Sequence, residues 1–275
     1  MPELPEVETV VRTLRTLVSG KTIERITVNL ARIIRRPDDV EEFKAQLIGQ
    51  TIHAVERRAK FIKFILDRDV LISHLRMEGR YGVYNQDEEV EKHTHVIFHF
   101  TDGTELRYRD VRQFGTMDII PKGLEHETPP LQGLGPEPLD ESFSLALFRK
   151  MLKGKTTKIK PLLLNQEFLV GLGNIYVDES LFRARIHPEK PAGELTPRQV
   201  SRLHESIIET LQEAVDQGGS SIKSYVNGQG EMGMFQQSLN VYGRKEEPCP
   251  ICKTQIIRFV VGGRGTHICP KCQKP

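Results

Sequence analysis

The sequence predicts an α+β protein with a β-rich N-terminal part, a helical part after it and a small metal-binding hairpin at the end. Six runs between residues 51 and 120 have the apolar patterns of strands. Helical spacing returns between residues 142 and 217. The cysteines fall into two Cys-x-x-Cys pairs near the C-terminus. A chain of 275 residues has room for about two domains and a large core.

The first predicted element is an N-terminal helix. Pro5 suits a first helical position, and Glu6 and Glu8 suit the positive end of the helix dipole. Apolar residues follow at helical spacing: Leu4, Val7, Val11, Leu14 and Val18.

A second, shorter helix is predicted over residues 40–48. Asp38 and Glu41 resemble a capping box, and Gly49 ends the helix. Strands are then predicted over Thr51–Arg58, Lys60–Leu66, Val70–Leu75, Thr94–Phe100, Thr104–Arg109 and Gly115–Ile120, with a hairpin at Asp102-Gly103. This spacing favours an antiparallel sandwich or barrel.

Helices follow a linker. The segment Pro121–Pro138 is rich in proline and glycine, as domain linkers are. Helices are predicted over Ser142–Leu152 and over Pro197–Gln217, where Thr196-Pro197-Arg198-Gln199 forms a capping box. Between them, Lys160–Pro188 predicts a short helix, a Gly-Leu-Gly turn and a helix that opens at Asn174.

Residues 218–233 hold five glycines and three serines, which favour a loop. The loop is either a plain linker or a lid that closes over a substrate. We expect three parts: residues 1–130, residues 131–236 including this loop, and residues 237–275.

Charge and hydropathy narrow the class of protein. No apolar run reaches 18 residues, and Glu3, Glu6 and Glu8 occupy the place of the basic and apolar parts of a signal peptide. We therefore expect a cytoplasmic protein. Residues 244–275 carry seven basic and two acidic side chains, which indicates either a phosphate-binding patch or a solvated surface.

The four cysteines predict one structural zinc ion per chain. Two Cys-x-x-Cys pairs, with 16 residues between them, suit a tetrahedral site, and four sulfur ligands leave no open position for water. Two disulfides are the alternative. The expected ligands are Cys249, Cys252, Cys269 and Cys272, and no organic cofactor is expected. Strands over Gln255–Val261 and Thr266–Ile268 would place Arg264 at the tip of a zinc hairpin.

The extreme N-terminus offers a reactive amine. A small second residue permits removal of Met1, which leaves Pro2 as a secondary amine with a pKa of about 8. Such an amine can attack an aldehyde-level carbon, and its adduct is an iminium that stays positive and remains an electron sink. Glu3 beside it could transfer protons. The alternative is that both residues only start a helix.

Other residues are ambiguous by themselves. The turn before Asn174 can bind an anion through free N–H groups, or Asn174 can cap its helix. His93, His95 and His99 share one side of a strand whose apolar residues face the other way, which predicts a solvent- or substrate-facing surface rather than a metal site. Met77, Phe114 and Arg112 lie near strand ends.

Together these motifs resemble the bacterial formamidopyrimidine-DNA glycosylase family. Five elements occur in the family's order: Pro2–Glu8, Lys92–Val96, Arg112–Gly115, Gly173–Tyr176 and the four cysteines. Leu4 differs from the glycine typical of the related endonuclease VIII branch, and Val111 and Gln113 replace a commoner proline and arginine. The resemblance implies a β-sandwich domain, a helical domain with a helix–two-turn–helix motif, and a zinc finger.

The resemblance also implies a function and residue roles. The protein would act as a monomer in base excision repair and would remove 8-oxoguanine and formamidopyrimidines from double-stranded DNA by base flipping, Schiff-base formation and β,δ-elimination. The implied catalytic residues are Pro2, Glu3, Lys60 and Arg264. The implied DNA contacts are His74, Met77, His93, Arg112, Phe114, Lys155, Asn174 and Tyr242, and the implied lesion-covering loop contains Ser220, Ile222, Ser224 and Tyr225.

Three other interpretations remain open at this level. A non-catalytic DNA-binding protein with a zinc ribbon explains the basic C-terminus but not Pro2-Glu3. An enzyme of the endonuclease VIII type is disfavoured by Leu4. A family member without activity is disfavoured by the presence of Pro2, Glu3, Lys60 and Arg264.

Overall fold

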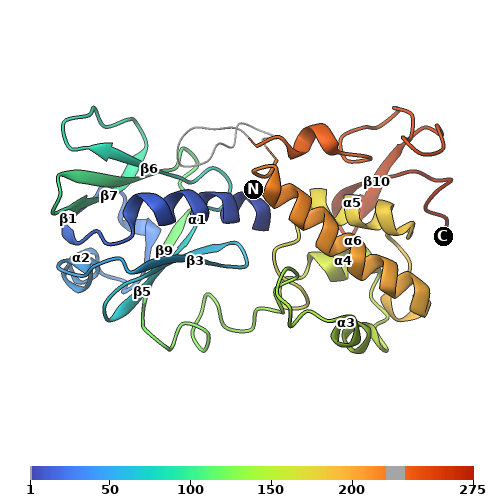
Figure 1. The fold of residues 1–275 in the computed structure, drawn as a ribbon, viewed down its shortest axis with the longest axis horizontal. Helices are drawn as coiled ribbons and strands as arrows, with labels where there is room; N and C mark the ends of the chain where they lie inside the picture. Colours follow the sequence, from blue (N-terminus) through green and yellow to red (C-terminus); the bar gives the residue numbers. More distant parts are fainter. Residues whose placement is uncertain (1, 221–232) are drawn as a thin grey trace. The chain divides into compact units, whose positions relative to one another are not determined.

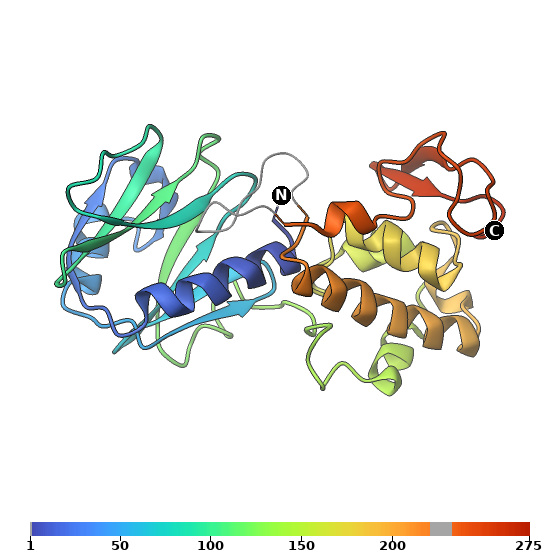
Figure 2. The same cartoon turned by 45° about the horizontal axis from the view of Figure 1, so that its top comes forward.

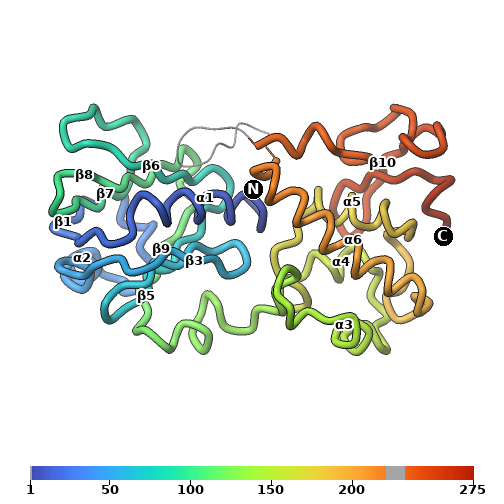
Figure 3. Tube along the Cα trace, viewed as in Figure 1, coloured from blue at the N-terminus to red at the C-terminus, as the bar shows by residue number. Residues whose placement is uncertain are grey.

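The computed structural model describes residues 2–220 and 233–275. The chain divides into two compact units, each treated by itself below. Unit 1 comprises residues 1–133 and 218–233, and unit 2 comprises residues 134–217 and 234–275. The change from unit 1 to unit 2 falls within the proline- and glycine-rich segment (Figure 3). None of the described helices has both the length and the apolar character that crossing a membrane requires.

Unit 1 contains two sheets (Figure 1). The first has the strand order β1-β7-β8-β6, and the second has the order β2-β9-β5-β4-β3. Neighbouring strands are antiparallel except β2 and β9, which are parallel. The strands are β1 (Ile23–Val28), β2 (Ile34–Arg36), β3 (Ala54–Arg58), β4 (Phe61–Ile65), β5 (Asp69–His74), β6 (Arg80–Asn85), β7 (Thr94–Phe100), β8 (Thr104–Arg109) and β9 (Thr116–Pro121).

One apolar core joins the two sheets and the helices of unit 1. The helices are α1 (Leu4–Val18) and α2 (Val40–Leu47), with a short 3₁₀ helix, η1 (Ala31–Ile33). Val7 of α1, Phe64 of β4 and Phe98 of β7 are all buried in this core. Because α1 packs on β3 and β4, its first residues are fixed beside the turn that joins those two strands.

The predicted sandwich is confirmed, with local differences. The side chain that caps α2 is Asp39, whose Oδ1 accepts the N–H of Glu42 at 2.7 Å, and not Asp38. Strands β1, β2 and β6 were not predicted. Each has charged residues or glycine among its apolar ones, so its alternation is weak.

Two of the three histidines predicted to face outward are buried. His95 and His99 are 7% and 5% exposed, whereas His93 is exposed. The Nε2 atom of His95 lies 2.9 Å from the carbonyl of Asp110, and Nδ1 of His99 lies 2.6 Å from Glu105. These two rings are buried together with polar partners. The alternation of apolar and polar residues along a strand cannot show that a polar side chain is buried in this way.

Unit 2 is built around α5 (Asn174–Ala184), which packs against the long helix α6 (Pro197–Asp216) (Figure 2). The predicted capping box of α6 is confirmed, since Thr196 and Gln199 exchange side-chain bonds with each other's backbone N–H. The remaining helices are α3 (Leu145–Leu152), α4 (Ile159–Leu164) and the 3₁₀ helices η2 (Ala192–Glu194) and η3 (Phe235–Ser238).

A C-terminal hairpin contacts α5 through its second strand. Strands β10 (Ile257–Val261) and β11 (Arg264–Ile268) pair antiparallel. The turn contains only Gly262 and Gly263, which take φ values of +55° and +74°, a region that favours glycine. Arg264 is therefore the first residue of β11 rather than part of the turn, and its side chain is exposed.

Candidate active site and phosphate-binding surface

The start of α1 brings together three of the predicted catalytic residues. Glu3 is the N-cap of α1, and its N–H donates to Oε2 of Glu6 at 2.8 Å in a reciprocal capping box. The Glu3 carboxylate forms an ion pair with the Nζ atom of Lys60, which lies in the turn between β3 and β4. Pro2 directly precedes Glu3 and is also buried.

The surroundings of Glu3 disfavour the charged form of its carboxyl group. It is 9% exposed, and burial raises its pKa above the usual value although the charge of Lys60 opposes this. A raised pKa favours the role of a general acid, because the group then keeps its proton to a higher pH. Because its folded-state pKa is raised, this group contributes stability below its unfolded pKa, and that contribution is lost as the pH rises through the folded pKa.

We expect Lys60→Met to raise the pKa of Glu3 further, because the substitution removes the opposing cation from a buried carboxyl. Carbon NMR of glutamate-labelled protein, titrated with pH, measures this directly. Lys63→Met is the matched control, because Lys63 pairs with Glu56 and Glu125 instead. An unchanged or lowered Glu3 pKa in Lys60→Met would contradict the assignment.

Glu6 was not predicted as a site residue, yet it connects α1 to the glycine-rich loop. Its Oε1 accepts the N–H of Ser220 at 2.7 Å while Oε2 accepts that of Glu3. Gly219 has φ of +80°, and a Cβ there would come within 2.9 Å of the Glu6 side chain. The first residues of the loop are therefore anchored at the catalytic helix. Ile222, Ser224 and Tyr225 lie outside the described residues.

The loop after β8 presents Arg112 and Phe114. Phe114 is 53% exposed, and the Arg112 guanidinium lies 5.1 Å from the centre of its ring. The buried carboxylate of Asp110 organises the loop, because it accepts the N–H groups of Arg112, Phe114 and Gly115 at 3.1, 2.9 and 2.8 Å. The exposed ring of Phe114 is thus carried by a loop whose backbone is fixed by hydrogen bonds to Asp110.

We expect Asp110→Ala to destabilise unit 1 by about 2–4 kcal/mol, since it leaves three N–H donors, that of Gly115 buried and the other two part-buried, without their charged acceptor. Urea unfolding measures the change. Asp102→Ala, at the exposed β7–β8 turn, is the control and should cost less. Equal costs at the two positions would show that Asp110 has no special part in the loop.

Three other predicted DNA contacts lie on unit 1. His74 ends β5, and its Nδ1 accepts the N–H of Arg76 at 2.9 Å. Burial, assisted by the charges of Arg76 and Lys60, lowers the pKa of His74 to about 3. The ring is therefore neutral at pH 7 with its proton on Nε2, where it can donate to a phosphate oxygen. Met77 is half-buried after β5, and His93 is exposed.

On unit 2, Asn174 and Arg264 are connected through Gly265. Asn174 is the first residue of α5, and its Nδ2 donates to the Gly265 carbonyl at 2.8 Å. The alternative in which Asn174 caps its helix is wrong, because the N-cap is Gly173. Lys160 of α4, which is fully buried, donates to the same carbonyl at 3.0 Å and to Asp178 at 2.6 Å. Lys160 and Asp178 were not predicted.

A second unpredicted carboxylate, Glu179, holds the segment that contains Tyr242. It is fully buried and accepts the N–H groups of Asn240, Val241 and Tyr242, each at 2.9 Å. The Tyr242 ring lies edge-on to His267, with the ring centres 5.0 Å apart. Lys155, by contrast, is exposed before α4.

The four cysteines form the expected metal site. None of them is in a disulfide, and all four sulfur atoms lie within 4.8 Å of one another. A tetrahedron with zinc–sulfur bonds of about 2.3 Å has edges of about 3.8 Å, so this arrangement fits zinc. The disulfide alternative is therefore wrong. Around the cysteines the apolar cluster is small: Phe182, Val241 and Ile256 are its other buried members.

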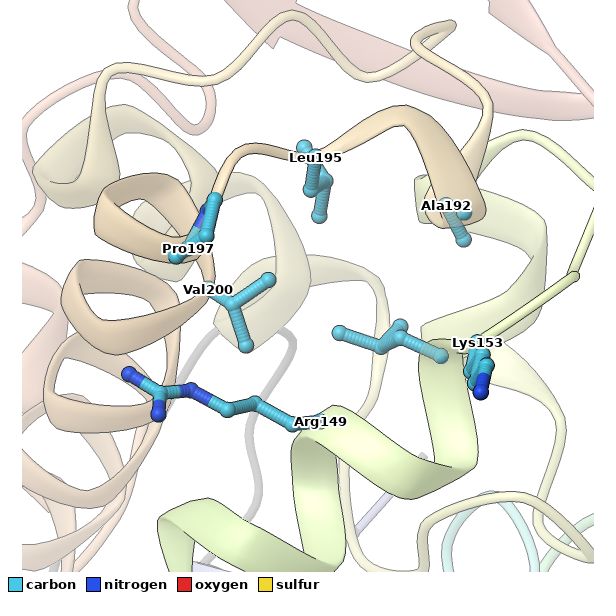
Figure 4. A pocket seen from close by; sticks show the side chains of 8 residues that line it. Arg149, Lys153, Ala192, Leu195, Pro197 and Val200 are labelled. Atoms are coloured by element: carbon cyan, nitrogen blue, oxygen red, sulfur yellow. The ribbon is translucent and has the colours of Figure 1, made fainter.

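A separate cavity of about 270 Å³ lies between α3 and α6 in unit 2 (Figure 4). Arg149 and Lys153 border an otherwise mainly apolar lining. The lining contains no carboxylate, histidine, cysteine or hydroxyl side chain, so we do not place the reaction there. It consists of Arg149, Leu152, Lys153, Ala192, Gly193, Leu195, Pro197 and Val200.

Comparison with known families accounts for most of the chain. Residues 1–117 match the formamidopyrimidine-DNA glycosylase N-terminal domain, residues 134–226 match the helix–two-turn–helix domain of the same enzymes, and residues 246–275 match a zinc finger found in these enzymes and in isoleucyl-tRNA synthetase. The fold and site thus define a DNA-glycosylase class of protein with a structural zinc finger.

Curated relatives and solved structures agree. A formamidopyrimidine-DNA glycosylase of Brevibacillus brevis is 76% identical over 100% of this chain and 99% of its own length, and one of Geobacillus kaustophilus is 57% identical over 100% of both. A mutant of the Lactococcus lactis enzyme, solved with DNA containing Fapy-dG, has a TM-score of 0.93 at 44% identity over 100% of both chains. The chain belongs to the formamidopyrimidine-DNA glycosylase family. The predicted α+β fold, helix–two-turn–helix motif and zinc finger are confirmed.

Proposed function

We propose that this protein removes 8-oxoguanine and formamidopyrimidine bases from double-stranded DNA and then cleaves the abasic strand. The observation that carries the proposal is the geometry at the start of α1. A buried carboxyl with a raised pKa adjoins Pro2, and Lys60 contacts it from the next hairpin. The names of the relatives support the glycosylase step, and solved neighbours contain abasic-site and Fapy-dG DNA.

The proposed reaction begins at the free nitrogen of Pro2, which requires that Met1 has been removed. The nitrogen forms a bond to C1′ of the flipped nucleotide, and the glycosidic bond breaks. The base leaves with the bonding electrons and accepts a proton, and the sugar ring opens to an iminium. We assign the delivery of these protons to Glu3, the N-cap of α1 and the neighbour of Pro2 in the chain.

Strand cleavage follows from the electron demand of the iminium. Loss of the C2′ proton sends electrons toward the iminium carbon and expels the 3′ phosphate. A second elimination expels the 5′ phosphate, and hydrolysis restores the amine of Pro2. We assign Lys60 and Arg264 to the phosphates that leave, because a fixed cation stabilises the developing negative charge.

Phosphate binding would hold the DNA in register without reading its sequence. His74, as a neutral Nε2–H donor, suits this role on unit 1. On unit 2, one Nδ2 hydrogen of Asn174 binds Gly265, which leaves the second for a phosphate, and the N-terminus of α5 favours an anion. Arg112 and Phe114 would fill the space left by the flipped base, with Met77 as a third wedge.

A lesion panel tests the proposal. Single-turnover cleavage is measured on duplexes that contain 8-oxoguanine opposite cytosine, a formamidopyrimidine, thymine glycol, or no lesion. We expect cleavage of the purine lesions with phosphate at both ends of a one-nucleotide gap. Faster cleavage of thymine glycol would indicate the endonuclease VIII specificity instead. Binding without cleavage of any duplex would indicate a non-catalytic DNA-binding protein.

A further inference from the structure

A buried ion pair in unit 2 has no part in the reaction proposed above. Asp178 lies one turn after Asn174 on α5, and its side chain and that of Lys160 are both 0% exposed. Asp178 Oδ1 accepts from Lys160 Nζ at 2.6 Å, and Oδ2 accepts the backbone N–H of His267 at 2.9 Å. A buried charge is stable only when it is paired and hydrogen-bonded, and both conditions are met here.

The pair connects two helices to the strand that begins with Arg264. Lys160 donates to the carbonyl of Gly265 at 3.0 Å, and Asp178 binds the N–H of His267. One ion pair thus holds the backbone of β11 at two points. Lys160 of α4 binds it at Gly265, and Asp178 of α5 binds it at His267. Asn174 binds the same Gly265 carbonyl, so its amide is fixed by the same arrangement.

Charge gives Asp178 a second role. Burial lowers the pKa of Lys160, Asp178 opposes that change, and the charge of Arg264 adds to it. Arg264 is therefore near enough to Lys160 for the two cations to repel each other. The carboxylate of Asp178 is the counter-charge to Lys160 in this buried pair.

We propose that Asp178 is a positioning residue that, through Lys160 and β11, holds Arg264 and Asn174 in the arrangement that binds DNA phosphates. The inference rests on the proposed function, because that function assigns DNA phosphates as the ligands of Arg264 and Asn174. The side chain of Asp178 is fully buried, so it acts through its neighbours.

Asp178→Asn is the first test, because it keeps the size of the side chain and removes its charge. At saturating enzyme we expect base excision and adduct formation at Pro2 to be unchanged. We expect the ratio of δ- to β-elimination product to fall by about tenfold or more, since small misplacement of a catalytic group is costly. The slope of log affinity against log salt should shrink by about one, the change for one lost phosphate contact.

Two further variants keep the test decisive. The double variant Lys160→Met/Asp178→Leu replaces the ion pair by apolar side chains, and it should fold and bind zinc. It serves as the test if Asp178→Asn does not fold, and it should show the same selective losses. Glu213→Gln is the matched control, because it breaks the α5–α6 pair with Arg183 away from β11. It should leave both readouts at wild-type values.

Two results would overturn the inference. One is a wild-type product ratio and salt slope in both the Asp178→Asn and the double variant. The other is a parallel loss of excision, trapping and thermal stability, which would mean that the pair serves the fold alone. A wild-type protein that forms no adduct and cuts no lesion strand would refute the proposed function itself, and the inference with it.

Discussion

Glu3→Gln is expected to bind lesion DNA normally and to excise the base about 10²–10⁴-fold more slowly, the usual contribution of a positioned proton-transfer group. Glutamine keeps an oxygen that can accept the N–H at the start of α1, so the capping box can persist. What is lost is the proton, because the amide cannot donate one as a carboxyl with a raised pKa does. Affinity and single-turnover excision, measured on the same duplex, separate the two effects.

Glu8→Gln is the matched control for this prediction. Glu8 lies on the same helix and pairs with Arg57 and Arg12, away from the capping box. It should leave excision nearly unchanged. Excision at the wild-type rate by Glu3→Gln would refute the role of Glu3, and equal losses in both variants would point to the helix rather than to the carboxyl.

Removal of zinc is expected to produce the second large effect, a loss of about 10²-fold or more in DNA affinity. Structural zinc sites contribute about 10–16 kcal/mol to folding of small metal domains, and the apolar cluster around these cysteines is too small to replace that contribution. Without the metal, the hairpin that carries Arg264 has no fixed geometry. Chelation followed by an affinity measurement tests this, and Cys269→Ser gives the genetic equivalent.

The zinc prediction has a specific internal control. Borohydride trapping at saturating DNA measures adduct formation at Pro2, which belongs to unit 1. Removal of zinc should therefore reduce the yield of trapped adduct less than it reduces DNA affinity. Adding zinc back should restore affinity in the chelated wild type but not in Cys269→Ser. A metal-free protein with wild-type affinity would contradict the role given to the finger.

The sequence was a good guide where the spacing of residues is itself diagnostic. The capping box at Thr196 and Gln199 joins residues three positions apart, and the two Cys-x-x-Cys pairs form a motif by their spacing; both were predicted correctly. Strand β6 was missed because Gly82 and Arg80 interrupt its apolar alternation. The cap of α2 was misplaced by one residue, since Asp38 and Asp39 are chemically equivalent in a sequence.

Contacts between distant segments could not be predicted. Glu179 binds N–H groups that are 61 to 63 positions further along the chain, and Asp178 binds one 89 positions further. In the sequence these two residues are only two acids in a helical stretch. Glu3 was singled out through its neighbour Pro2, but its contact with Lys60 depends on the β3–β4 hairpin meeting α1. The contact of Asn174 with Gly265 could not be predicted for the same reason, because the two residues lie 91 positions apart.

The most direct test of the central claim is borohydride reduction in the presence of a duplex that contains 8-oxoguanine opposite cytosine, followed by mass mapping of the adduct. A covalent adduct on the nitrogen of Pro2 is the predicted result, and it would establish the removal of Met1 and the iminium together. An adduct on a lysine, Lys60 included, or binding with no adduct at all, would contradict the account.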